Sequence, residues 1–207
     1  MKAFIYSGGG IYPDNIIEHP ASDDLIIAAD SGYDNAKLMG VCPDILLGDF
    51  DSLHESDVPS GIKTLKVPAE KDFTDTQLAV DTAIKNGAGE IIIIGGLDGR
   101  LDHTLSNLAI LEDMWERKIF CTVTDGKNRV RYIENASVLI PKSNYRYLSV
   151  IARTKKLRGV EIKGCKYPLE NATIDKNFQY AVSNEIVENC ALIAIRRGGA
   201  YIVESIG

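Results

Sequence analysis

The chain has 207 residues and a net charge of −6, and its 45% hydrophobic and 25% charged residues are typical of a folded globular protein. Its Lys and Arg residues do not gather into a basic stripe, which argues against a nucleic-acid-binding protein. No run approaches the roughly 20 apolar residues of a membrane helix, and the first residues predict a strand rather than a signal peptide. Four dispersed cysteines predict reduced thiols and a cytoplasmic location: Cys42, Cys121, Cys165 and Cys190.

The first half of the chain alternates short apolar runs with helical patterns. Several runs lack polar alternation, which predicts strands covered on both faces, as in a parallel sheet. The predicted strands are residues 3–6, 25–29, 45–47, 64–67, 91–94 and 120–123. Helices are predicted at residues 33–39, 75–86 and 102–117, and the second begins with Thr74 or Asp75 as its cap. This alternation favours an α/β fold with a mostly parallel sheet.

The third predicted helix carries an apolar stripe. Its large apolar residues recur at steps of three and four, which is the period of one helix face. We therefore expect the following side chains to be buried: Leu101, Leu105, Leu108, Leu111 and Trp115.

After Lys127 the pattern changes to short strands separated by turn residues, with no helical period. The predicted strands are residues 129–134, 137–140, 147–152, 159–162, 172–174, 185–188, 191–196 and 200–203. Many short strands at spacings of about 8–12 residues indicate a β-sandwich or barrel. We therefore predict two domains, an α/β domain at residues 1–127 and an all-β, jelly-roll-like sandwich at residues 128–207.

Aspartates gather directly after the predicted strands of the first half. One or two follow each of four strands: Asp30, then Asp49 and Asp51, then Asp72 and Asp75, then Asp98 and Asp102. Ligands of open α/β sheets bind beyond the carboxyl ends of the strands, so four segments would bring carboxylates to one edge. Such carboxylates repel one another unless a cation lies among them. The pattern predicts a site for Mg²⁺ and phosphate groups, since Mg²⁺ takes carboxylate ligands and bridges phosphates.

Single features of this pattern have simpler explanations. An Asp after a strand often caps the next helix, and Asp75 is the clearest such case. Residues 8–10 are glycines that either let backbone amides approach phosphates or form an ordinary turn, and no P-loop sequence is present. Arg100 either binds a phosphate or pairs with a neighbouring Asp. His103 either takes part in the chemistry or bonds to Asp102 at the helix start.

Four strings of the first half together resemble the thiamine pyrophosphokinase family: ADSG, PDILLGDFDSL, EKDFTDTQLA and GGLDGRLDH. KYPLEN and a Ser-Asn-Glu string in the second half are similar to it as well, so the likeness runs along nearly the whole chain. The resemblance implies an N-terminal domain for ATP, a C-terminal β-sandwich for thiamine, and a homodimer with sites in clefts between subunits. It also implies a Mg²⁺-dependent transfer of the diphosphate group of ATP to thiamine, which yields AMP and thiamine diphosphate.

The resemblance further implies roles for individual residues. Those matching the acids nearest to Mg²⁺ and the ATP phosphates are Asp49, Asp51 and Asp72. Those completing the polar pocket are Asp30, Asp75, Arg100, Asp102 and His103, with Arg100 and Asp102 among the catalytic residues. Ser183 and Asn184 would lie near the thiamine. One carboxylate would accept the proton of the thiamine alcohol while Arg100 stabilises the growing charge.

Two departures from the family pattern concern the thiamine site. The family often has a glycine before the Ser-Asn pair, whereas this chain has Tyr180-Ala181-Val182. Its one Trp lies in the first half, so the aromatic partner of thiamine is expected to be Tyr180, Phe178 or Tyr201.

Two other functions fit the same acidic array. A Mg²⁺-dependent nucleotide phosphohydrolase would use water as its nucleophile, but it has no need of a second domain for an acceptor. A non-catalytic nucleotide-binding regulator would not explain why so many acidic groups follow the predicted strands.

Overall fold

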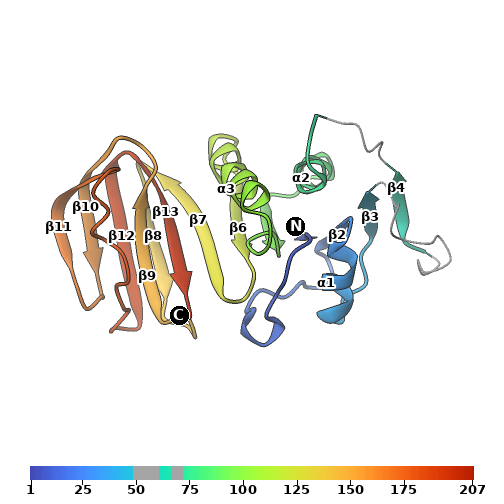
Figure 1. Cartoon of the computed structure of the whole chain (residues 1–207), viewed down its shortest axis with the longest axis horizontal. Coiled ribbons are helices and arrows are strands. Elements are labelled where there is room, and N and C mark those ends of the chain that lie inside the picture. The colour runs from blue at the N-terminus through green and yellow to red at the C-terminus, as the bar shows by residue number, and fades with distance from the viewer. Residues whose placement is uncertain (49–60, 67–71) are drawn as a thin grey trace. The chain divides into compact units, whose positions relative to one another are not determined.

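The computed structural model of the protein describes residues 1–48, 61–66 and 72–207. Its chain divides into two compact units, Met1–Gly126 and Lys127–Gly207 (Figure 1). Two of the aspartates singled out above, Asp49 and Asp51, lie outside the described residues, as does the end of the strand predicted at 64–67. Within the described part of the chain, every helix is too short or too polar to cross a membrane.

The first unit is built on a parallel sheet whose described strands run in the order β4-β3-β2-β1-β5-β6 (Figure 1). The strands are β1 (Lys2–Tyr6), β2 (Leu25–Ala29), β3 (Ile45–Gly48), β4 (Lys63–Lys66), β5 (Glu90–Ile94) and β6 (Phe120–Thr124). The chain first adds strands on one side of β1 and then continues with β5 on its other side. The β1–β5 pair is therefore the topological switch point, where sheets of this kind bind their ligands.

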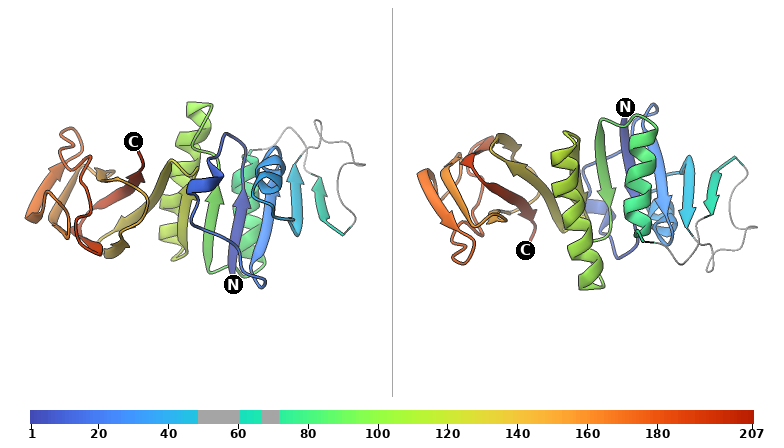
Figure 2. Two further views of the ribbon diagram at one scale, coloured as in Figure 1. Left: turned by 90° about the horizontal axis from the view of Figure 1, so that it is seen from below. Right: turned by 90° about the horizontal axis from the view of Figure 1, so that it is seen from above.

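Helices cover both faces of this sheet. They are α1 (Gly32–Leu38), α2 (Asp75–Lys85) and α3 (Leu101–Glu116), and a short 3-10 turn, η1 (Pro13–Asn15), follows β1. Figure 2 shows α1 on one face and α2 with α3 on the other. Thr74 is the cap of α2: its Oγ1 accepts a hydrogen bond from Gln77 N, and its own N donates to Gln77 Oε1. This reciprocal pair satisfies two backbone donors that would otherwise be unpaired at a helix start.

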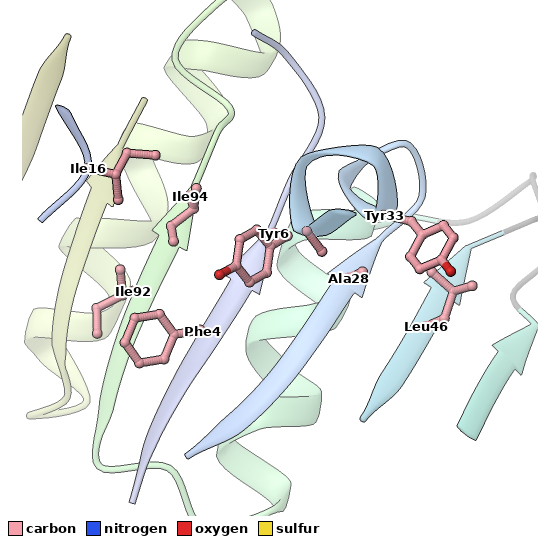
Figure 3. Packing of buried hydrophobic residues seen from close by; sticks show 9 residues of the cluster. Phe4, Tyr6, Ile16, Ala28, Tyr33, Leu46, Ile92 and Ile94 are labelled. Carbon is pink, nitrogen blue, oxygen red and sulfur yellow. The ribbon is translucent and has the colours of Figure 1, made fainter. Parts of the chain in front are cut away.

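The core on the α1 face is continuous across the central strands. Its buried members include Phe4, Tyr6, Ile16, Ala28, Tyr33, Leu46, Ile92 and Ile94 (Figure 3). Burying one large apolar side chain contributes roughly 1.5–3 kcal/mol. The opposite face is equally apolar, with Ile5, Ile27 and Ile93 fully buried, which explains the lack of polar alternation in these strands. Burial also raises the pKa of the Tyr6 phenol to about 12.

The predicted burial of the α3 stripe is wrong for its first two residues. Leu101 is 69% exposed and Leu105 is 58% exposed. The prediction is confirmed for Leu111, while Leu108 and Trp115 are half-buried. The helix also buries Asn107, Ile110 and Met114. The periodicity identifies the helix correctly, but the face that packs inward is set by how the helix lies against β6, the strand that follows it, and against α2.

The second unit is all β, with two antiparallel sheets. One runs in the order β7-β13-β9, formed by Asn128–Glu134, Gly199–Ser205 and Tyr147–Ala152. The other runs in the order β11-β10-β12-β8, formed by Leu169–Asp175, Lys156–Lys163, Cys190–Arg197 and Ser137–Pro141. The prediction of an α/β unit followed by an all-β unit is confirmed at this level.

The strand predicted at residues 185–188 does not form. This segment makes only an isolated bridge between Ile186 and Cys165, and the N–H groups of Val187 and Glu188 both donate to Gly164 O. Ser183, just before it, has a left-handed backbone with φ 56°, which turns the chain out of the extended conformation that a ladder needs.

Candidate active site

A cavity of about 370 Å³ opens beyond the carboxyl ends of β1, β2 and β5. Its walls are the loop after β1, the residues that follow β2, the first turn of α2, the loop after β5 and the start of α3. This is the switch point of the sheet, so strand order alone leaves a crevice there. The lining residues are mostly polar and small.

The glycine loops after β1 and β5 are joined through their backbones. Gly96 N donates to Gly8 O at 2.8 Å, and Ser7 N donates to Ile94 O at 2.9 Å. Gly9 has φ 92°, and a Cβ there would lie 2.9 Å from the backbone oxygen of Asp98. Only glycine lets these two loops approach so closely.

Two buried asparagines, one on α1 and one on α3, donate hydrogen bonds to carbonyl groups of these loops. Asn35 of α1 donates from Nδ2 to Ser7 O at 2.7 Å and to Gly9 O at 2.9 Å. Asn107 of α3 donates from Nδ2 to Gly96 O at 3.0 Å. Because these carbonyls are bonded inward, the loops have a defined shape without any regular ladder.

The sequence did not single out these asparagines. The available signal was weak: each is an amide on an inward helix face, where asparagine is otherwise disfavoured because it competes for backbone hydrogen bonds. A second buried contact was missed as well, between the hydroxyls of Ser7 and Thr76, whose oxygens lie 2.8 Å apart. It links the first strand end to the first turn of α2.

Three carboxylates line the cavity, from three separate segments. Asp30 follows β2 and has a left-handed backbone with φ 50°, a conformation that aspartate tolerates better than most residues. Asp75 is the first residue of α2, with Thr74 rather than Asp75 as the cap. Asp98 lies in the loop after β5, where its Oδ2 accepts a hydrogen bond from Gly10 N at 3.2 Å. The gathering of acids at this edge is therefore real for these three residues.

Arg100 lines the cavity and also forms a two-pronged ion pair with Asp102. Its Nη2 lies 2.6 Å from Asp102 Oδ2, and its Nε donates to Asp102 Oδ1 at 3.2 Å. The hydrogen bond from Arg100 lowers the pKa of the Asp102 carboxyl below its ordinary value, and His103 N also donates to that carboxylate. The ion-pair explanation of Arg100 thus describes its side-chain contacts with the described residues.

Two aspartates that follow β5 differ in their place at the cavity. Asp98 lines it, whereas Asp102, which the resemblance puts among the catalytic residues, does not; both side chains are exposed. Asp102 is paired with Arg100, which does line the cavity. His103 does line the cavity.

The three predicted metal ligands are not brought together within the described residues. Asp72 is exposed, in a bend before α2, and is not part of the cavity wall, while Asp49 and Asp51 lie outside the described residues. Among residues 1–48, 61–66 and 72–207, no three acidic, histidine or cysteine side chains form a metal-binding group. The carboxylates that do line the cavity are nevertheless the oxygen donors that suit Mg²⁺.

In the second unit, the two residues expected near thiamine differ in their surroundings. Ser183 is exposed, with its N donating to Ser149 Oγ at 3.0 Å. Asn184 is buried: its Oδ1 accepts from Tyr167 N, and its Nδ2 donates to Tyr167 O at 2.7 Å. The Asn184 side chain therefore shapes the loop that presents Ser183.

The three residues considered as aromatic partners of thiamine differ in their exposure. Tyr201 is buried and lies edge-on against Tyr132, with ring centroids 5.7 Å apart. Phe178 and Tyr180 are 71% and 43% exposed, and their ring centroids lie 5.9 Å apart. Only the latter two have ring surface that a ligand can cover.

The fold and the cavity define a class of protein: an α/β unit with a polar cavity at its switch point, followed by an all-β unit. Comparison with known proteins narrows this class. A model of the family described as "Thiamin pyrophosphokinase, catalytic domain" matches residues 18–136, and one described as "Thiamin pyrophosphokinase, vitamin B1 binding domain" matches residues 136–198. The chain belongs to the thiamin pyrophosphokinase family and is an enzyme.

Individual relatives agree over the whole length. The chain is 29% identical to the thiamine pyrophosphokinase of Bacillus subtilis, over 99% of each chain. A crystal structure of the Bacillus subtilis thiamine pyrophosphokinase matches with a TM-score of 0.90 and 26% identity, covering 100% of both chains. A crystal structure of the Geobacillus thermodenitrificans thiamin pyrophosphokinase matches with a TM-score of 0.84 and 26% identity, covering 99% of this chain and 97% of that one.

Proposed function

We propose that this enzyme transfers the pyrophosphate group of ATP to the hydroxyl group of thiamine, giving thiamine diphosphate and AMP. The observation that carries this proposal is the polar cavity at the switch point of the unit that matches the catalytic-domain model. Because the second unit matches a vitamin B1 binding domain, thiamine is the acceptor of the pyrophosphate group in this proposal. Transfer rather than hydrolysis follows, because hydrolysis requires no acceptor-binding unit.

Each of the two units binds one substrate. Residues 1–127 bind ATP and carry the catalytic groups, and residues 128–207 bind thiamine. We further propose that the two antiparallel sheets of the second unit form a jelly-roll-like sandwich. The burial pattern supports it: Ala191, Ile193 and Ile195 alternate with less buried residues on β12, as Leu148 and Val150 do on β9.

The ATP phosphates lie in the cavity of the first unit. The glycine loop after β1 lets its backbone approach them, and Arg100 donates its remaining N–H groups. Asp30, Asp75 and His103 complete the wall on the nucleotide side. Asp102 holds the Arg100 guanidinium in place, so it is a positioning residue in this proposal.

The carboxylates of Asp49, Asp51 and Asp72 would hold Mg²⁺ beside the phosphates, and Asp30, Asp75 and Asp98 add acidic donors at the same sheet edge. When bound, Mg²⁺ supplies charge neutralisation on the phosphate oxygens. Acids packed around a polyphosphate would repel it otherwise, so these residues fit a dependence on Mg²⁺.

The reaction joins the thiamine oxygen to the β-phosphorus of ATP and breaks the bond between that phosphorus and the oxygen leaving with AMP. A carboxylate at the sheet edge accepts the hydroxyl proton, and Arg100 stabilises the negative charge that grows on the transferred group. The protein contributes position and charge rather than a covalent intermediate.

Thiamine binds in the second unit beside Ser183, on the exposed rings of Phe178 and Tyr180. Thiamine is a cation with flat rings, and aromatic faces attract both features. The protein acts as a homodimer with sites in clefts between subunits. A cytoplasmic location is supported by the four cysteines, all of which are free.

The test is chromatography of nucleotides and thiamine species after incubation with ATP, Mg²⁺ and thiamine. We expect AMP and thiamine diphosphate in equal amounts, and neither product when thiamine or Mg²⁺ is withheld. Phosphate or nucleotide products formed without thiamine would show a phosphohydrolase, and intact ATP would show a binding protein. Either result would contradict the proposal.

A further inference from the structure

The second unit contains a hollow of about 490 Å³ that shares no residue with the cavity of the first unit. It lies where β7 ends, where β10 begins and where β12 turns into β13. Four of its eight lining residues are cations, Lys155, Lys156, Arg158 and Arg197, against a single carboxylate, Glu134. The local excess of positive charge in this hollow is opposite in sign to the net charge of the chain, which is −6.

The two arginines are direct cross-strand partners. Arg158 on β10 lies opposite Arg197 on β12 in the antiparallel register, so both side chains project from the same face of the sheet. Like charges directly opposite one another destabilise a strand pair. Both side chains are exposed, and neither has an ion pair or a side-chain hydrogen bond within the described part of the chain.

The neighbouring charges do not cancel this pair. Lys156 contacts Asp175 at 3.4 Å, so its charge is partly balanced. Glu134 accepts a hydrogen bond from the Tyr132 hydroxyl at 3.0 Å and forms no ion pair with another described residue. Lys155 lies on the hollow as well. The hollow therefore keeps an excess of positive charge after its internal contacts are made.

The base of the hollow is held in a defined shape by short hydrogen bonds. Gly198 N donates to Asn135 Oδ1 at 2.8 Å, and Asn135 N donates to Gly198 O at 3.1 Å. Gly199 N donates to Thr154 Oγ1 at 3.1 Å. These bonds join three turns that carry or flank the cations, so the cations project from a framework that does not need a ligand to form.

We propose that this hollow binds the phosphate chain of a small molecule, a diphosphate group carried either by free pyrophosphate or by a nucleotide. Each guanidinium group can donate two hydrogen bonds to paired phosphate oxygens. A multiply charged anion bound between Arg158 and Arg197 would attract both and so offset their mutual repulsion. A single carboxylate would offset only one of the charges. No divalent cation is required, because the protein groups are themselves positive.

The test is isothermal titration of the full-length protein with inorganic pyrophosphate in EDTA. Without a divalent cation, the acidic cavity of the first unit repels pyrophosphate, so heat measured in EDTA reports on the hollow and not on that cavity. The variant R158Q with R197Q removes the arginine pair. The matched control, K163Q with K176Q, removes two exposed charges of the same unit that lie outside the hollow.

We expect saturable binding by the wild-type protein and the control, and at least tenfold weaker binding by the arginine variant. Equal binding by the arginine variant, or no saturable heat with the wild-type protein, would overturn the proposal. If the double variant does not fold, as judged by circular dichroism, R197Q alone provides the same comparison.

A parallel titration with ADP in EDTA distinguishes the source of the diphosphate. Equal affinity for ADP and pyrophosphate identifies the phosphate chain alone as the ligand, and tighter binding of ADP identifies a nucleotide. The absence of saturable binding of both overturns the proposal. None of these results depends on catalytic turnover, so failure of this inference leaves the pyrophosphate-transfer assay unaffected.

Discussion

Charged groups are enclosed in the β7–β13 strand pair and open in the cavity of the first unit. In the second unit, Arg129 and Glu204 are buried and bind each other through two short contacts, 2.7 Å from Nη2 to Oε1 and 2.8 Å from Nε to Oε2. Arg131 adds a contact to the same carboxylate at 3.4 Å, and Arg129 lies over the Tyr145 ring. In the cavity of the first unit, charged side chains come from several separate segments and face a common open space.

This difference separates stability from function. An enclosed charge must have a partner, because an uncompensated charge in a low-dielectric interior is costly. Charges at the open end of a parallel sheet keep their hydration until a ligand replaces it. Charged residues therefore hold β7 and β13 together, whereas those that line the cavity of the first unit remain open to a ligand.

The largest expected effect is on the enclosed pair. Glu204→Gln leaves Arg129 buried without its counter-ion, so the free energy of unfolding should fall by about 3–5 kcal/mol. Urea denaturation followed by circular dichroism measures it. Glu185→Gln, which removes the partner of an exposed lysine, is the control and should change stability far less. Equal losses in the two variants would show that burial does not distinguish these pairs.

The next effect concerns activity alone. Asp72→Asn should reduce the rate of thiamine diphosphate formation by about 10²-fold or more, since it removes a charge that would hold Mg²⁺ beside the phosphates in the proposed site. Asp72 is exposed, so thermal unfolding should not change. Asp34→Asn, on the exposed side of α1, is the matched control and should keep full activity. Undiminished turnover by the Asp72 variant would remove this residue from the metal site.

The third effect joins stability and activity. Asn35→Ala leaves the carbonyls of Ser7 and Gly9 without their buried donor, which should cost about 1–3 kcal/mol of unfolding free energy. Because the glycine loop loses its shape, kcat should also fall. Asn86→Ala, which removes one exposed amide contact, serves as the control. A loss of stability with unchanged kcat would mean that the loop does not position substrate.

A smaller effect is expected at the start of α2. Thr74→Ala removes the side-chain acceptor for Gln77 N and should cost about 1 kcal/mol. Thr74→Ser keeps the hydroxyl and should keep most of the stability. Thermal denaturation of both variants measures the difference, and equal loss in both would show that the cap is not what matters there.

The smallest expected effect on stability involves the exposed pair of Arg100 and Asp102. The folded-state pKa of Asp102 is lowered, so the pair stabilises the fold above the carboxyl's ordinary pKa of about 4 and this contribution is lost as pH falls through the folded value. Arg100→Gln should raise the pKa of Asp102 toward its ordinary range. NMR titration of the Asp102 side chain measures the shift. An unchanged pKa would show that Arg100 is not the cause.

Local pattern accounts for much of what was predicted. Among the described residues, the strands of the first unit and the three predicted helices follow from apolar runs, helical periods and capping residues, which act over a few neighbouring positions. Thr74 shows this well: its cap involves Gln77, three residues away. The position of the cavity also follows from the sequence, because acids placed after parallel strands share one edge.

Long-range contacts decided the rest. The position of Asp98 beside Gly10 in the cavity wall and the pairing of Arg158 with Arg197 both depend on elements distant in the chain. Residues 185–188 have strand-forming composition, yet no neighbouring strand offers them a continuous ladder.

The sequence by itself therefore determined most of the described elements, the two-unit organisation at the level of α/β followed by all-β, and the family. Only the tertiary structure decided which polar groups are enclosed and paired and which are left open to a ligand. The physical reason is range: propensity and capping act between near neighbours, whereas burial and strand register are set by residues that meet only after the chain has folded.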